Sequence, residues 1–248
     1  MVMVDNFGKP FLSAEWRYLA MVNYEIEPAV LMPFVPKGTE LDSWNGKTFV
    51  SMVGFLFLNT RVAGLSIPFH QNFEEINLRF YVRRKGADGW RRGVVFIKEI
   101  VPRVAIAVTA RWLYNENYVA LPTGNEILRS PDNSAHVESV KYFWTFRHQT
   151  YFIEVATRGE PTPIAAGSEE EFIAQHYWGY SVQKDGGTVE YRVEHPLWRV
   201  WQARSSRFDC DVEEFYGKQF TRALNVAPSS AFLAEGSKVT VYHGKRIE

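Results

Sequence analysis

Four side chains that could do chemistry alternate along the stretch 73–83, which reads FEEINLRFYVR. Glu75, Asn77, Arg79 and Tyr81 supply a carboxylate, an amide, a guanidinium and a phenol, in that order. A period of two is typical of a β-strand, where alternate side chains share one face at a spacing of about 7 Å. This polar face either lies in water or lines a cavity that binds something small and charged.

Arg111 extends this set, because it falls in a predicted strand, 104–114, of the same antiparallel meander. The side chains that we expect on the same face of this strand as Arg111 are small, which leaves space above the sheet. Two arginines that converge in a cavity could bind a carboxylate bidentately, and Glu75 could then act as a general acid or base. Glu75, Arg79 and Arg111 could instead form a buried ion-pair network that fixes the register of the sheet.

Lys98 is a second candidate, since we expect it to lie between Phe96 and Ile100 on one face of the predicted strand 90–101. A lysine taken out of water has a lowered pKa, which suits Schiff-base chemistry. A lone lysine on an edge strand more often extends its ammonium group to water, and we favour that interpretation here.

Metal and cofactor chemistry find no support in the sequence. The six histidines show no short ligand spacing, and no phosphate loop, dinucleotide fingerprint or nucleophile elbow occurs. His176, on an apolar helical stripe, and His195, before a proline, are expected to be structural. We therefore predict neither a metal site nor a cofactor.

The elements that must position these residues are mostly strands. Asn45-Gly46 predicts a hairpin turn, and Ser168 with Glu171 predicts a capping box at the start of a helix. The expected strands are 17–24, 47–62, 73–83, 90–101, 104–114, 137–145, 147–157, 188–194, 197–203 and 238–243, and the expected helices begin at Pro28, span 169–180 and span 211–224.

Composition narrows the class of protein further. The 248 residues carry 28 basic and 28 acidic side chains, and this net charge of +0 argues against nucleic-acid binding. Aromatic residues make up 15%, which favours strands and large cavities. The one cysteine suits a reducing cytoplasm. With no apolar run of membrane-spanning length, no leader pattern and no linker, we expect one cytoplasmic domain over 1–248 that does not enter membranes.

The segment 73–122 resembles the central part of the acetoacetate decarboxylases. Phe73-Glu74-Glu75 stands where those proteins have a Tyr-Asn-Glu strand start, and the segment 110–118, ARWLYNENY, stands where they carry the Schiff-base lysine. Glu75, Arg111 and Tyr114 match that pattern. The lysine position falls at Tyr118, so the imine that serves as an electron sink cannot form there.

The whole chain is similar to the uncharacterised YqjF-like family, a relative of the decarboxylases. The similar features are Trp16, the Asn45-Gly46 hairpin, the strand from Glu75, the glutamate-rich helix from Ser168 and the segment 194–198, EHPLW. The resemblance implies a mainly β fold of the α+β kind. In this fold a curved antiparallel sheet closes into a cone or barrel around a cavity, with a few flanking helices.

We therefore expect a protein that binds a small, anionic organic ligand inside this sheet. Glu75 would be the catalytic residue, and the ligand-binding residues would be Arg79, Arg111, Asn77, Tyr81 and Tyr118. Its chemistry would be that of a lyase or hydrolase without imine formation. The alternative is a non-catalytic ligand-binding or sensing module on the same scaffold. The related decarboxylases also imply a homo-oligomer.

Overall fold

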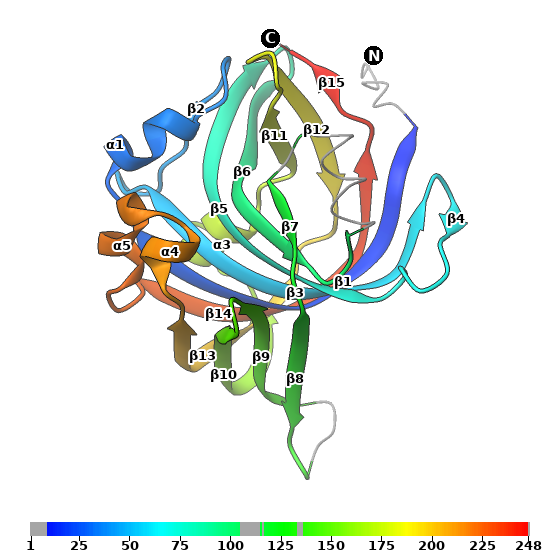
Figure 1. Ribbon diagram of the computed structural model, residues 1–248, viewed down its shortest axis with the longest axis vertical. Coiled ribbons are helices and arrows are strands. Elements are labelled where there is room, and N and C mark those ends of the chain that lie inside the picture. The colour runs from blue at the N-terminus through cyan, green and yellow to red at the C-terminus, as the bar shows by residue number, and fades with distance from the viewer. Residues whose placement is uncertain (1–8, 105–114, 116, 133–135, 248) are drawn as a thin grey trace.

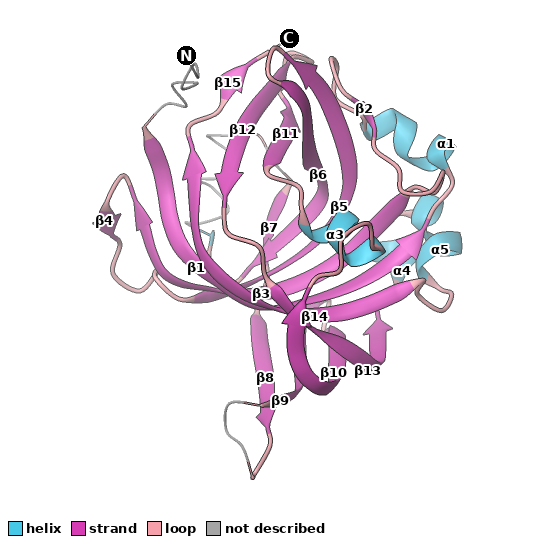
Figure 2. Cartoon of the chain, turned by 180° about the vertical axis from the view of Figure 1, so that it is seen from behind, coloured by secondary structure: helices cyan, strands magenta, loops and turns pink. Residues whose placement is uncertain are grey.

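The computed structural model describes residues 9–104, 115, 117–132 and 136–247, and the described part of the chain is dominated by one sheet (Figures 1 and 2). Its strands are β1 (Pro10–Glu25), β2 (Glu40–Leu41), β3 (Phe49–Val62), β4 (Leu65–Ser66), β5 (Phe73–Gly86), β6 (Gly89–Val101), β7 (Tyr118–Ala120), β8 (Thr123–Arg129), β9 (Val137–Phe146), β10 (Gln149–Pro163), β11 (Trp178–Val182), β12 (Thr188–Glu194), β13 (Arg199–Asp209), β14 (Ser230–Tyr242) and β15 (Lys245–Arg246).

Seven of these strands form a closed ring. Their order is β12-β11-β6-β5-β3-β1-β14, and Val193 and Glu194 of β12 pair with Val241 and Thr240 of β14 to close it. Most neighbours are antiparallel, whereas β6 is parallel to β11 and β7. The ring narrows like a cone in Figure 1. The predicted curved sheet is therefore confirmed.

The remaining long strands extend the sheet beyond β14 in the order β13, β10, β9 and β8. This extension packs its apolar side chains against the outer face of the ring, where the fully buried Tyr142 and Trp144 join one core cluster with residues of β3 and β5. A second cluster fills part of the ring interior and includes Phe55, Tyr81 and Phe232. Strand β5 is thus buried on both faces.

Helices are few and short (Figure 2). Most of them lie on the outside of the sheet, whereas the helix that carries Phe172 and Ile173 packs these side chains into the core cluster of the ring interior. Those described are α1 (Pro28–Leu31), the 3₁₀ turn η1 (Met32–Phe34), α3 (Glu169–Ala174), α4 (Val212–Phe215) and α5 (Lys218–Leu224). None of them is long and apolar enough to cross a membrane.

The predicted helix 169–180 begins correctly but ends early. The Ser168 side chain accepts a hydrogen bond from the Glu171 amide at 3.1 Å, as the capping box requires. The helix ends at Ala174, and the segment Trp178–Val182 is strand β11 instead. Pairing with β6 and β12 overrides the helical apolar stripe, because it satisfies the backbone of this segment within the ring.

One predicted helix is divided in two, and one predicted strand falls on residues that the structure does not describe. The predicted helix 211–224 is two helices, because Gly217 adopts a φ of 105° and breaks it. The predicted strand 104–114, which carries Arg111, lies almost entirely outside the described residues.

Strand β6 contains an irregularity that decides which side chains face the ring interior. Phe96 lies opposite Arg79 and Lys98 lies opposite Leu78, so Ile97 is an extra residue in the register. This is a β-bulge. The prediction that Phe96 and Lys98 share a face is therefore wrong.

Candidate functional site

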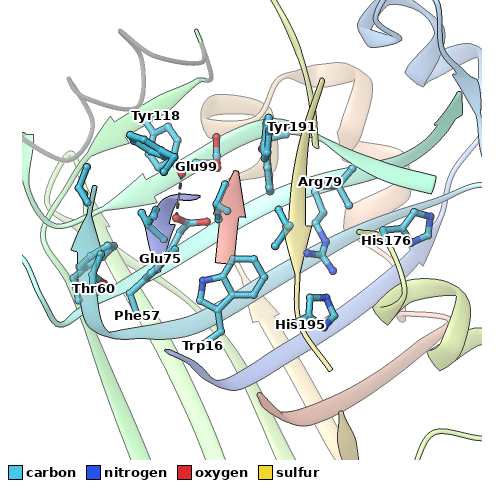
Figure 3. Close-up of a pocket in the computed structure, with 18 of the residues that line it drawn as sticks. Trp16, Phe57, Thr60, Glu75, Arg79, Glu99, Tyr118, His176, Tyr191 and His195 are labelled. Carbon is cyan, nitrogen blue, oxygen red and sulfur yellow. Dashed lines mark hydrogen bonds between the residues drawn. The ribbon is translucent and has the colours of Figure 1, made fainter. Parts of the chain in front are cut away.

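A cavity of about 230 Å³ lies inside the ring and is lined mainly by apolar and aromatic side chains (Figure 3). Ligand pockets of this kind combine an apolar wall with a few polar groups that fix orientation. The volume lies below the roughly 300–1,000 Å³ of pockets for drug-sized ligands, so the cavity has room only for a smaller molecule. The polar residues of the wall are Thr60, His70, Glu75, Arg79, Glu99, Tyr118, His176, Tyr191 and His195, and the aromatic ones include Trp16, Phe57, Phe73, Phe96, Trp178 and Trp198.

One end of the cavity is acidic. Glu75 and Glu99 both lie there, and their exposed fractions are only 3% and 1%. Glu75 accepts hydrogen bonds from Asn77 Nδ2 at 3.0 Å and from the Tyr118 hydroxyl at 3.2 Å. Tyr118 reaches it from β7, which lies beside β6 in parallel register with Glu99. Figure 3 shows this group of carboxylates and phenol together.

Burial raises the pKa of Glu75 to about 7. Hydrogen bonds from Asn77 and Tyr118 and the charge of Arg79 oppose this shift but do not cancel it. A carboxyl group with a pKa near neutrality can both give and take a proton at the working pH of most proteins. This is the protonation behaviour that a general acid or base needs.

Replacing Glu75 with glutamine tests this pKa through stability. A carboxyl whose pKa is raised on folding stabilises the folded state at low pH, and this contribution is lost as pH rises through about 7. From pH 5 to pH 8 the wild type should therefore lose about 2 kcal/mol of unfolding free energy relative to Glu75→Gln. Urea unfolding at the two pH values measures the difference. Parallel pH dependence of the two proteins would contradict the raised pKa.

The other end of the cavity is basic, and Arg79 dominates it (Figure 3). Arg79 Nη2 has weak contacts with the Ile173 carbonyl at 3.5 Å and with Met21 Sδ at 4.0 Å. Its buried Nε atom has no hydrogen-bond partner, and no carboxylate of the described residues lies within ion-pair distance. An incompletely paired guanidinium in an apolar wall favours the binding of an anion.

Two histidines accompany Arg79. His176, buried at 7% exposure, places Nε2 3.3 Å from Asp42 Oδ2. His195 stacks on Trp198 with a centroid distance of 4.1 Å. Burial lowers the pKa of each histidine to about 4, and the charge of Arg79 acts in the same direction. Both imidazoles are therefore neutral at pH 7, and Arg79 supplies the positive charge.

The structure separates the predicted site residues into groups. Glu75, Arg79 and Tyr118 line the cavity. Asn77 lies behind it as a hydrogen-bond donor to Glu75, and Tyr81 is buried against His176 with its hydroxyl 2.6 Å from Ser51 Oγ. The four predicted residues of β5 do share its inner face, as the alternation predicts. Of these four, only Glu75 and Arg79 reach the cavity.

Lys98 points away from the cavity. Its ammonium group donates to the Phe215 carbonyl and lies 4.2 Å from the centre of the Phe215 ring, in the outer core. Burial lowers the pKa of Lys98, so the expected extension to water is not what its contacts show. Among the described residues, no lysine lines the cavity. The residues that the structure does not describe include no lysine in the sequence.

Several cavity residues are absent from the sequence-based site. Glu99, His176, His195, Trp16 and Thr60 all lie on the wall. His176 and His195 had been assigned structural roles from their local sequence. Contacts such as that between His176 and Asp42, which are 134 positions apart, leave no local pattern to detect. Among the described residues, no group of three histidine, cysteine or acidic side chains could hold a metal ion.

Solved structures of known proteins share the fold of this chain. Acetoacetate decarboxylase from Legionella pneumophila is 11% identical with a TM-score of 0.66, covering 99% of this chain and 90% of that one. An acetoacetate-decarboxylase-like enzyme from Sphingomonas wittichii RW1 is 12% identical with a TM-score of 0.65, covering 100% and 98%. The enduracididine biosynthesis enzyme MppR, complexed with pyruvate, is 14% identical with a TM-score of 0.66, covering 99% and 93%. The fold is thus acetoacetate-decarboxylase-like.

Within this class, the chain belongs to the DUF2071 family, described as an uncharacterized conserved protein, whose model matches residues 13–238. The uncharacterized protein YqjF of Bacillus subtilis (strain 168) is 36% identical over 75 residues. That match covers 30% of this chain and 31% of the relative, so the chain spans about a third of the curated relative's length in it. The predicted kinship with the YqjF-like family is confirmed.

Proposed function

We propose that this protein binds a small organic anion in the cavity, with the carboxylate of the ligand on Arg79, and that Glu75 transfers a proton to or from it. The observation that carries the proposal is the Arg79 guanidinium, which lines the cavity and has no carboxylate of the described residues within ion-pair distance. A ligand carboxylate would provide a directly paired counter-charge. The complex of MppR with pyruvate supports the proposal, because that related fold holds a small carboxylate.

Schiff-base chemistry is not part of the proposal. An imine needs a lysine that reaches the ligand, whereas no lysine of the described residues lines the cavity, and the resemblance to the decarboxylases aligns their lysine with Tyr118. The Tyr118 hydroxyl instead donates to Glu75. It therefore belongs to the acid–base group at the acidic end, where it helps to hold the carboxyl in place.

The binding part of the proposal predicts a specific effect of Arg79→Ala. Charge-assisted hydrogen bonds contribute about 1.5–3 kcal/mol, so the variant should bind small carboxylates about 10- to 100-fold more weakly than the wild type. Isothermal titration with carboxylates of two to six carbons measures the change. Arg83→Ala is the matched control, since Arg83 lies on the same strand and pairs with Glu40 at the surface. Equal affinity of the Arg79→Ala variant and the wild type would reject Arg79 as the anchor.

A non-catalytic binding or sensing role is the second candidate, and the observation that favours it is that no lysine in the described part of the chain lines the cavity. Glu75→Gln separates the two roles for any carboxylate that binds. If the protein is an enzyme, turnover of the ligand should fall in this variant while its binding is retained. If the ligand is bound and released unchanged by wild type and variant alike, the sensing role is supported.

A further inference from the structure

An aromatic wall around Trp16 forms much of the apolar surface of the cavity. The Trp16 ring makes edge-to-face contacts with Phe55 and Phe57, at centroid distances of 5.3 and 5.9 Å, and with Trp198 at 6.4 Å. Phe57 in turn stacks on Phe73 at 4.7 Å. The Trp16 nitrogen is a fully buried atom, whereas the residue as a whole is only partly buried, so the ring meets a ligand through carbon atoms. The wall is therefore apolar, and its rings hold one another in place.

This wall lies between the two polar ends of the cavity. In Figure 3 the Trp16 ring stands between the Glu75 carboxylate and the Arg79 guanidinium. Glu75 and Arg79 are four residues apart on β5, which separates their Cα atoms by about 13 Å. Arg79 Nη1 makes no hydrogen bond to the described residues and, unlike Nε, is not fully buried, so a ligand can reach it. An anion of two or three carbons on Arg79 therefore leaves the space beside Trp16 unfilled.

The cavity has room for one six-membered ring together with a carboxylate. An engineered apolar cavity of about 150 Å³ in another protein holds benzene, which has six non-hydrogen atoms. By the same ratio, the volume of about 230 Å³ found here accommodates about nine. A six-membered carbon ring that carries one carboxylate has this number. A smaller acid leaves atoms of the wall without contact partners and so loses part of the attraction that the wall offers.

We propose that the cavity binds an arylcarboxylate, with the carboxylate on Arg79 and the aromatic ring against Trp16, directed towards Glu75. A flexible chain with the same number of atoms would lose conformational freedom against the fixed wall, whereas a ring is rigid before it binds. An aromatic ring also gains edge-to-face contacts with aromatic side chains. This inference rests on the proposed function, since it assumes that Arg79 binds a carboxylate.

Benzoate and a set of comparison ligands test the inference on the wild type. Isothermal titration at pH 7 should show benzoate binding about 10- to 100-fold more tightly than acetate or pyruvate, because only benzoate buries a ring. Benzoate should bind about threefold more tightly than cyclohexanecarboxylate, which has the same number of non-hydrogen atoms but no aromatic edge. Benzyl alcohol keeps the ring but lacks the charge, and it should bind about 10- to 100-fold more weakly than benzoate.

Trp16→Leu tests the position of the ring. This variant should bind benzoate about tenfold more weakly than the wild type and should bind acetate equally well, because acetate on Arg79 does not use the wall. Trp90→Leu is the matched control, since Trp90 is 50% exposed and does not line the cavity. The comparison of ligands on the wild type stands whether or not Trp16→Leu folds.

The outcomes separate this inference from the proposed function. If acetate and pyruvate bind as tightly as benzoate, and Arg79→Ala weakens all three, the arylcarboxylate is overturned and the anion site stands. Equal or tighter binding of cyclohexanecarboxylate would overturn the aromatic ring, and an unchanged affinity for benzoate in folded Trp16→Leu would overturn its place. If benzyl alcohol binds as tightly as benzoate, or if no carboxylate binds, both proposals fail.

Discussion

Glu190→Ala should lower the unfolding free energy by about 3–5 kcal/mol, because it removes one partner of a buried ion pair. Glu190 Oε2 lies 2.7 Å from Arg91 Nη1, and its side chain is 1% exposed. Glu190 Oε1 accepts from Arg84 Nη1 at 3.4 Å and from the Tyr180 hydroxyl at 3.1 Å. The substitution removes the buried counter-charge of the Arg91 guanidinium, which also pairs with the 44% exposed Asp88 at 2.8 Å.

Urea unfolding with Glu194→Ala as control measures this effect. Glu194 lies on the same strand, and its pair with Arg192 at 3.4 Å has a carboxylate side chain that is 51% exposed. Exposed ion pairs contribute about 1 kcal/mol or less, so the control should remain close to the wild type. Similar losses in the two variants would show that the buried network does not hold these strands together.

Gly236→Ala should lower the unfolding free energy by about 2–5 kcal/mol, a range that overlaps that of Glu190→Ala. Gly236 adopts a φ of +80°, which costs an L-residue about 1–2 kcal/mol. A Cβ at this position would also lie 2.0 Å from the Trp16 carbonyl oxygen, which is backbone and cannot rotate away. Separating β14 from β1 to relieve this overlap adds about 1–3 kcal/mol.

Gly64→Ala isolates the first of these two costs. Gly64 has a φ of +79°, and a Cβ there would meet no atom within 4 Å. Its loss should be limited to about 1–2 kcal/mol. Thermal or urea unfolding of the two variants gives the difference, which reports the contact with Trp16. If the variants lose equal stability, the close approach of β14 to β1 is not restrictive. Because Trp16 lines the cavity, Gly236→Ala should also weaken carboxylate binding.

Parts of the fold follow directly from local sequence. The alternation in 73–83 does divide β5 between an outer core, with Ile76, Leu78 and Phe80, and an inner face. Asn45 and Gly46 form the expected turn, with φ values of +49° and +78°. The two strands that flank the turn do not pair with each other as a hairpin would require. Strand β2 pairs with β5 instead, and only the bridge between Trp44 and Lys47 closes the turn. Turn chemistry is local, whereas the choice of partner strand depends on the whole sheet.

The candidate site was predictable only where one strand carries it. Glu75 and Arg79 follow from the period of two in β5, and Tyr118 from the resemblance to the decarboxylases. His176 depends on a contact with Asp42 that only the folded ring creates. Its apolar neighbours in sequence suggested a longer helix, whereas the helix ends at Ala174. Long-range pairing therefore hid His176, which lies beside Arg79, from sequence analysis.

The bulge in β6 gives the cavity its chemical character. Counted along a regular strand from Phe96, an inward position would fall on Lys98 and an outward one on Glu99. The additional residue, Ile97, reverses this assignment, so the carboxylate faces inward and the amine is placed against Phe215. Glu99, and not Lys98, therefore faces the acidic end of the cavity. This depends on the number of residues in β6 as well as on their types. In β6, the position of one additional residue therefore decides whether a carboxylate or an amine faces the cavity.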